Sequence, residues 1–200
     1  GGSSQGMLRW ALIELLGRSA VPLLSAISGW LAAASLSRRG WALFVAGKAR
    51  TILAPMVAWN ALAILLVCGA AYAGWIQAPT PTTLRWTVNE LFCLLSPDDI
   101  NVQMSFLRDL FVCMLAAPLL VRLPRRALVA VALAALIWAI SGLEFPLLLR
   151  PAILLFFVCG IIARREGFGR WLASRPLGVV ALPYVLLALA KIWAAMSGGS

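Results

Sequence analysis

The stretch of residues 52–76, ILAPMVAWNALAILLVCGAAYAGWI, decides the fold class of this protein. It contains no charged side chain and exceeds the roughly 20 apolar residues that a helix needs to cross the hydrocarbon core of a bilayer. The composition agrees, because 62% of all residues are hydrophobic and 12% are charged, whereas about a quarter of a soluble domain is charged. Lipid is therefore expected to cover much of the outer surface.

Five further apolar runs share the character of this one. The sequence thus predicts an all-α fold, a polytopic transmembrane bundle of about six helices in one domain over residues 7–196. Two amphipathic stretches, 7–16 and 84–95, are expected to lie at the membrane interface or to re-enter the membrane. The Gly- and Ser-rich ends, residues 1–6 and 197–200, are expected to be flexible and linker-like or tag-like. The six expected spans are residues 20–36, 52–76, 106–121, 127–142, 151–163 and 177–196.

Positive charge is concentrated in the first, third and fifth connections between these spans. The net charge is +10, and its placement between apolar runs argues for a multi-pass protein of the bacterial inner membrane rather than for a nucleic-acid partner. The positive-inside rule puts these connections in the cytoplasm. The first span then starts outside, which predicts a further helix before residue 20 in the native protein. The three basic groups are Arg38, Arg39, Lys48 and Arg50; Arg122, Arg125 and Arg126; and Arg164, Arg165, Arg170 and Arg175.

The sequence contains no histidine, which removes the usual general base with a pKa near neutrality. It also contains no GxSxG, Walker or HExxH motif. No metal site is expected, because the cysteines lack CxxC or Cys/His spacing, and they are interpreted as small packing residues. The four cysteines are Cys68, Cys93, Cys113 and Cys159.

Arg108 and Asp109 lie inside the third expected span, where a centrally placed charge costs about 2.5–3.5 kcal/mol and calls for a partner. Neighbouring residues on a helix point about 100° apart, so the two are not expected to pair with each other directly. Two interpretations stay open: they form structural ion pairs that fix helix packing, or they face a polar cavity and bind substrate. Glu90, in the second connection, is expected to be solvated.

Lys48 and Arg50 precede Pro55 at the cytoplasmic end of the second span. They are either positive-inside anchors that need no ligand, or a cationic pair that attracts a phosphorylated molecule. Pro55 is expected to loosen the helix locally and to free backbone carbonyls there. Near it, Asn60 needs a hydrogen-bond partner or lines a substrate path, and Trp59 is expected to pack or to line a pocket.

Ser28 and Gly29 form a pair of small residues in the first span. Small residues inside a membrane allow two helix backbones to approach closely, so packing is the simpler interpretation of this pair. A place for Ser28 in a substrate path remains open.

Four segments, taken in chain order, resemble the acyltransferase-3 family of membrane-bound acyltransferases, which acylate sugars, peptidoglycan and exopolysaccharides. VPLLSAISGWL is similar to the family's VPLFFxxSGxL span, and GKARTILAPMVAWN to its KKxRTLLxPYLxWN span. FLRDLFV with a later APLL is similar to WFLRDLFV…PLL, and FFVCGIIAR to FxxGIxxAR. The four segments cover residues 21–31, 47–60, 106–112 together with 117–120, and 149–164.

The resemblance implies a cytoplasmic acyl-CoA donor, often acetyl-CoA, and a hydroxyl acceptor, commonly on a carbohydrate. Lys48 and Arg50 match the family's basic motif for the CoA phosphates, and Arg38 and Arg39 extend that patch. The residues expected to border the acceptor are Arg108, Asp109, Asn60, Trp59 and Ser28.

The sequence departs from the family in two ways. Family members have more spans, and the first of them carries an essential histidine that these residues lack. A truncated or fragmentary O-acyltransferase is therefore the leading hypothesis, and its base is expected on the missing helix. An inactive membrane scaffold and a small transporter are the alternatives.

Overall fold

The structure is a computed structural model that describes most of the chain between residues 18 and 178. Arg39 and the N-terminal amphipathic stretch 7–16 lie outside the described residues, as does the expected sixth span apart from residue 178. The described residues are 18–36, 38, 40–78, 80–81, 83–94, 100, 104–143, 148–176 and 178.

Every regular element in this part of the chain is a helix, which confirms the predicted all-α fold. The first, third, fourth and fifth expected spans form helices whose ends differ from the prediction by only one or two residues. The elements are α2 (Arg18–Leu36), α3 (Trp41–Lys48), η2 (Ala49–Leu53), α4 (Ala54–Tyr72), α5 (Leu84–Phe92), α6 (Ser105–Leu120), α7 (Arg125–Ser141), α8 (Pro151–Arg165) and α9 (Phe168–Ala173).

The second expected span belongs to a longer helix. The α-helices α3 and α4 are joined without a break by η2, a single π-helical turn in which the Ala54 N–H bonds to the Ala49 carbonyl. Pro55 follows this turn directly, and because proline has no N–H and its ring displaces the carbonyl four residues earlier, the regular ladder cannot continue there. The π turn is the local loosening that Pro55 predicts.

The continuous helix Trp41–Tyr72 is long and apolar enough to cross a membrane, by length and composition. It has 32 residues, and only 17% of its apolar window is buried within the protein. The helix Ala20–Leu36 is apolar but shorter. Among the described helices no other meets this test, so the count of about six spans remains a prediction.

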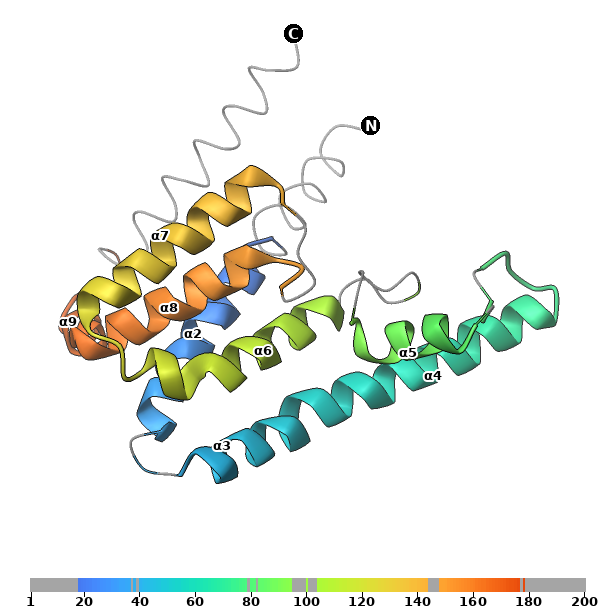
Figure 1. The fold of residues 1–200 in the computed structure, drawn as a ribbon, viewed down its shortest axis with the longest axis horizontal. Coiled ribbons are helices and arrows are strands. Elements are labelled where there is room, and N and C mark those ends of the chain that lie inside the picture. Colours follow the sequence, from blue (N-terminus) through green and yellow to red (C-terminus); the bar gives the residue numbers. More distant parts are fainter. Residues whose placement is uncertain are drawn as a thin grey trace, which may run out of the picture.

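In the segment expected at the interface or re-entering the membrane, residues 84–95, the structure has the short helix α5 over Leu84–Phe92. The Thr83 hydroxyl accepts a hydrogen bond from the Trp86 N–H at 3.1 Å and so caps the first turn. Figure 1 shows α5 folded back along the far end of α4, and the two helices are in contact. This hairpin-like return places the residues of α5 against α4 and near the start of α6.

The main bundle is built around α8, which contacts α2, α6 and α7. Its core consists of apolar side chains such as Phe157, Met114 and Leu128, none more than 2% exposed. In Figure 1, α2, α6 and α8 run toward the end where α9 lies, whereas α7 and the long helix run away from it.

Two glycines allow α2 and α8 to cross with their backbones in contact. A Cβ atom on Gly29 would overlap the carbonyl group of Phe157, and one on Gly160 would overlap the carbonyl of Ala26. Only glycine fits at either position without a backbone shift. The packing interpretation of Gly29 is therefore confirmed, and Gly160 is its partner on the other helix.

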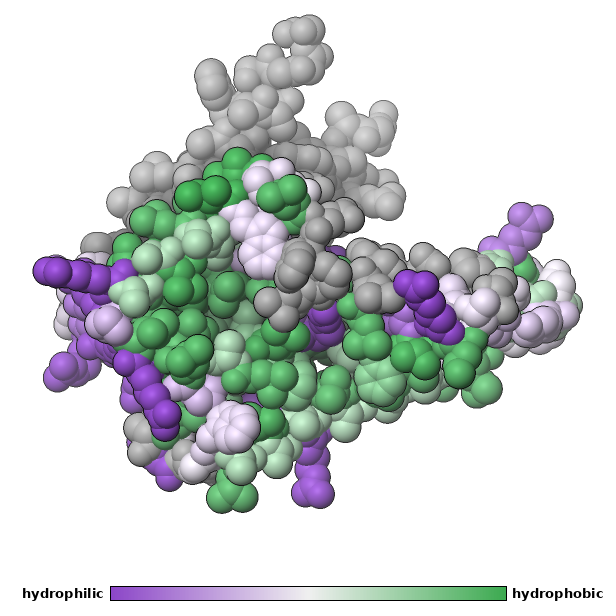
Figure 2. Space-filling model, in the orientation of Figure 1, coloured by the Kyte–Doolittle hydropathy of each residue, from purple (hydrophilic) through white to green (hydrophobic). Residues whose placement is uncertain are grey.

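The three basic connections lie at one end of the bundle. Figure 1 shows the α2–α3, α6–α7 and α8–α9 connections together at the end marked by α9, and hydrophilic side chains gather there in Figure 2. Arg165 donates to the carbonyl oxygens of Val121 and Leu123, just beyond α6, and Arg125 pairs with Glu166 at 3.2 Å. These contacts hold two of the connections together.

Candidate functional site

The residues singled out in the sequence fall into two places. Lys48 and Arg50 lie at the junction of α3 and η2, while Asn60, Arg108 and Asp109 lie where α4, α5 and α6 meet. Ten residues of helix at 1.5 Å per residue separate Arg50 from Asn60 by about 15 Å along the axis. The structure therefore divides the predicted site residues into a basic group and a buried polar group.

Arg108 and Asp109 form the centre of the buried polar group, with 9% and 0% of their surfaces exposed. Arg108 Nη1 donates to Asp109 Oδ1 at 2.6 Å. The expectation that these neighbours do not pair directly is wrong. Although their Cα–Cβ bonds diverge, the long arginine side chain reaches back around the helix, and burial of both charges makes the pairing necessary.

Asp109 also binds the start of α8. Its Oδ1 accepts a hydrogen bond from the Leu149 N–H at 3.2 Å, and its Oδ2 accepts one from the Arg150 N–H at 2.8 Å. These N–H groups immediately precede Pro151, the first residue of α8, where a negative charge is favoured by the helix dipole. The carboxylate thus has three donors, and it joins α6 to α8.

The last turn of α5 lies between Asn60 of α4 and Arg108 of α6. Asn60 Nδ2 donates to the Leu91 carbonyl at 3.2 Å and approaches Cys93 Sγ at 3.8 Å. Arg108 Nη2 donates to the Leu94 carbonyl at 3.2 Å. Cys93 is buried, and its backbone has the left-handed conformation, with φ of 52°. The chain changes direction there, which leaves the carbonyls before and after it open to the Asn60 and Arg108 donors. Asn60 and Arg108 thus bind the same segment from two different helices.

Glu90 is a member of this group that sequence reasoning placed in solvent. It is 2% exposed, and its Oε2 accepts a hydrogen bond from the Ile100 N–H at 3.2 Å. Trp86, Glu90 and Cys93 follow the i, i+4, i+7 spacing of one helical face. In a helix that packs against the protein, this spacing places Glu90 on the same inward face as Trp86 and Cys93.

Trp59 and Ser28 do not join this group. Trp59 is 60% exposed on the outer side of α4, although its neighbour Asn60 is buried. Ser28 is half-buried on α2, beside the Gly29 crossing. Their proposed contact with a substrate remains a prediction.

The basic group contains cations that the described part of the chain leaves without a carboxylate. Lys48 Nζ lies 5.8 Å from the centroid of the Phe44 ring, and Arg50 is exposed within the π turn. Arg38 is exposed in the preceding connection. Neither Lys48 nor Arg50 has an ion pair among the described residues, so both remain available to an external anion.

Comparison with known proteins places these residues in a family context. Residues 2–199 match the family model described as an acyltransferase domain. The chain is 33% identical over 195 residues to the succinoglycan biosynthesis protein ExoH of Rhizobium meliloti (strain 1021). That match covers 92% of the chain and 52% of the relative, so the chain spans about half the length of this curated relative. No solved structure matches the chain.

The family match covers nearly the whole chain and includes both the basic group and the buried polar group. The four resembling segments quoted from the sequence lie within the same range. The protein is therefore a member of the acyltransferase-3 family.

Proposed function

We propose that this chain belongs to a membrane O-acyltransferase that transfers an acyl group from acyl-CoA to a carbohydrate hydroxyl. Family membership supports the acyl-transfer class. The relative whose name refers to succinoglycan biosynthesis supports a polysaccharide acceptor. The observation that carries the donor assignment is the pair Lys48 and Arg50, which has no carboxylate partner in the described structure and occupies the position of the family's basic motif.

The membrane arrangement follows from helix direction and charge. Helices α2, α6 and α8 run toward the basic end, and α4 and α7 run away from it, as an alternating series of crossings requires. Large apolar side chains on the outer faces of α4 and α7, among them Leu65 and Ile140, are exposed and would meet lipid. We place the basic end in the cytoplasm of a bacterium, with the protein in its inner membrane.

The donor would bind at the cytoplasmic end of the long helix. Acyl-CoA carries several phosphate charges, and an arginine fork beside a lysine can hold phosphate oxygens through charge-assisted hydrogen bonds. The π turn widens the helix at Arg50, and such turns occur frequently at functional sites. Arg38, exposed in the preceding connection, and Arg39 would extend the same patch.

The buried polar group would form the wall of the acceptor path. Asp109 forms an ion pair with Arg108 and accepts a hydrogen bond from the start of α8. Asn60 and Arg108 donate hydrogen bonds to main-chain carbonyls at the end of α5. In this arrangement Arg108 and Asn60 are positioning residues, because their polar atoms bind protein main chain. Trp59 and Ser28 would contact the substrate only if it approached from the outer side of α4 or α2.

In the transfer step the acceptor hydroxyl oxygen attacks the thioester carbonyl. A C–O ester bond forms, the C–S bond breaks, the hydroxyl proton passes to a base, and CoA leaves as its thiolate, which then takes up a proton. The base is not a histidine of these 200 residues, because the sequence contains none. We propose that it is a histidine located outside them, as the family resemblance implies.

Calorimetric titration of the purified protein with acetyl-CoA tests the donor assignment. Saturable binding is expected in detergent, and the double variant Lys48→Ala/Arg50→Ala is expected to lose it, whereas desulfo-CoA should bind nearly as well as CoA. The variant Arg122→Ala/Arg126→Ala removes the same charge from another exposed pair at the basic end. Equal loss of binding in both variants would overturn a specific site and leave only general electrostatic attraction.

An inactive scaffold is the second candidate, and the absence of histidine favours it. A scaffold retains the fold but has no reason to bind acyl-CoA, so well-folded protein without saturable binding would establish this alternative. A transporter receives less support. Arg108 and Asp109, which would have lined its path, are bound to each other and to the main chain.

A further inference from the structure

We infer that α2, α8 and α9 together bind one anionic phospholipid, with an acyl chain in an apolar groove and the headgroup phosphate at a cluster of arginines. This site is separate from Lys48 and Arg50, and the inference does not rest on the acyl-transfer proposal. It arises from two cavities that share the same wall.

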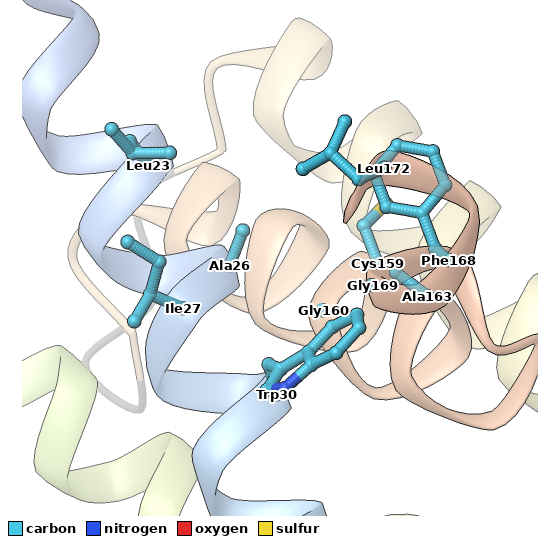
Figure 3. A pocket seen from close by; sticks show the side chains of 10 residues that line it. All are labelled: Leu23, Ala26, Ile27, Trp30, Cys159, Gly160, Ala163, Phe168, Gly169 and Leu172. Carbon is cyan, nitrogen blue, oxygen red and sulfur yellow. The ribbon is translucent and has the colours of Figure 1, made fainter. Parts of the chain in front are cut away.

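The first cavity is the apolar groove. Its volume is about 430 Å³, within the range of about 300–1,000 Å³ that is typical of small-molecule sites. Figure 3 shows Leu23 and Ile27 one turn apart on α2, and Phe168 and Leu172 on α9 at the other side of the groove. Trp30 stands at one end of it.

The groove exists because of glycine. Gly29 and Gly160 bring α2 and α8 into backbone contact, which leaves no large side chain to fill the space beside the crossing. At the end of α8 the chain turns through Gly167, whose φ of 70° is left-handed, and α9 then forms the opposite wall. Leu23 is 61% exposed, so the groove opens on the outer surface where lipid would lie.

The second cavity is basic and adjoins the first. It measures about 310 Å³, shares Trp30 and Gly169 with the groove, and is also lined by three arginines. Those arginines are Arg164, Arg165 and Arg170.

The charge of this cavity is not neutralised within the described part of the chain. Arg164 lies 5.5 Å from the centroid of the Trp30 ring, and Arg165 donates to main-chain carbonyls, so neither contact cancels a charge. The neighbouring carboxylate of Glu166 pairs with Arg125 instead. An anion that binds here would therefore meet several uncompensated guanidinium groups, which suit phosphate oxygens.

An apolar groove that is open to the side and continuous with a cationic cavity fits an amphiphile with one anionic head. The cavity belongs to the basic end of the bundle, which we place in the cytoplasm. Anionic lipids of the cytoplasmic leaflet meet basic pockets between helices at that depth. A diacyl phospholipid with net negative charge can fill both cavities at once, with an acyl chain in the apolar groove and its phosphate in the basic cavity. Inorganic phosphate would occupy only the basic cavity.

Native mass spectrometry of the whole chain, titrated with phosphatidylglycerol or phosphatidylcholine in neutral detergent, tests the inference. One phosphatidylglycerol per chain is expected to bind about 10- to 30-fold more tightly than phosphatidylcholine. Arg164→Ala/Arg170→Ala should remove this preference, and Arg122→Ala/Arg126→Ala should keep it. Cys159→Phe, which places a ring in the groove from an exposed position, should weaken both lipids.

Equal affinity for the two lipids would overturn the inference. So would identical behaviour of the two arginine double variants, or a wild-type chain that retains no lipid. Excess inorganic phosphate is expected to compete poorly, and full displacement by phosphate would reduce the site to a simple anion site. Acetyl-CoA binding, measured on the same Arg164→Ala/Arg170→Ala protein, should be unchanged, so this inference and the donor assignment fail independently.

Discussion

The Oδ2 atom of Asp109 accepts a hydrogen bond from the main-chain N–H of Arg150 at 2.8 Å, across 41 residues of sequence. This contact joins α6 to the residue that immediately precedes α8, the helix around which the bundle is built. The same carboxylate neutralises the buried Arg108, whose other nitrogen fixes the end of α5. Asp109 thus links α6 directly to the start of α8 and, through Arg108, to the residues that follow α5.

Replacement of Asp109 by Ala should destabilise the protein strongly. Arg108 would be left buried without its carboxylate, and breaking a buried pair in this way costs about 3–5 kcal/mol. Asp109→Asn should cost less, because its amide oxygen still accepts one N–H bond. Thermal unfolding in detergent measures both. The control is Glu166→Ala, which breaks an exposed pair worth about 0–1 kcal/mol, and a matching small effect for Asp109→Ala would refute the structural role.

Alanine at Gly29 or Gly160 should separate α2 from α8. The added methyl group meets a backbone carbonyl that cannot rotate away, and overpacking of this kind costs about 1–3 kcal/mol or more. A lower unfolding temperature is expected for each variant. Gly69→Ala is the matched control, because a Cβ there meets nothing within 4 Å and alanine favours the helix. If Gly69→Ala lowered the unfolding temperature while Gly29→Ala and Gly160→Ala left it unchanged, the backbone contact between α2 and α8 would be contradicted.

Loss of the Asn60 amide should loosen α5. In Asn60→Ala the Leu91 carbonyl loses a donor while α4 itself remains helical. Hydrogen exchange measured by mass spectrometry should then rise within residues 84–94 and stay unchanged in α7. Leu66→Ala, an exposed truncation on the same helix, should leave both regions as they are. Unchanged exchange at α5 in Asn60→Ala would show that this hydrogen bond does not hold the segment.

Much of the helical pattern was predictable from sequence because apolar runs in a membrane protein translate directly into helices. The limits of α6 and α8 fall within two residues of the ends of the apolar runs 106–121 and 151–163. The long helix is the exception: Lys48 and Arg50 interrupt the apolar pattern, so the sequence predicts a span over residues 52–76, yet the backbone continues helically through both cations. Hydropathy predicts which residues lie in lipid. The helix itself begins where its backbone hydrogen bonds begin, which here is outside the apolar run.

The candidate site was less predictable, because its geometry depends on contacts distant in sequence. Burial of Glu90 requires α5 to fold back on α4, and no local pattern specifies that return. The Arg108–Asp109 pair depends on a flexible side chain rather than on helical spacing. The arginine-lined cavity beside Trp30 requires α2 and α8, which lie more than a hundred residues apart, to meet at two glycines.

Chemical labelling of single cysteines should find the basic connections on the cytoplasmic side. In a Cys159→Ser background, Arg38→Cys and Arg122→Cys are expected to react with a membrane-impermeant maleimide only after the cells are permeabilised. Gln77→Cys, in the connection after α4, and Ser141→Cys, at the end of α7, should react in intact cells. All four residues are exposed, so accessibility reports the side of the membrane. Labelling of both sets in intact cells would contradict the proposed orientation.

The most direct test of the central claim is a thermodynamic cycle between the Lys48–Arg50 pair and the phosphates of the donor. Binding of acetyl-CoA and of acetyl-pantetheine, which lacks the phosphates, is measured for the wild-type chain and for Lys48→Ala/Arg50→Ala. The account predicts that the double variant loses affinity for acetyl-CoA about 10-fold or more, while its weak affinity for acetyl-pantetheine does not change. Equal losses for both ligands, or no loss for either, would contradict the assignment of Lys48 and Arg50 as the phosphate-binding part of an acyltransferase.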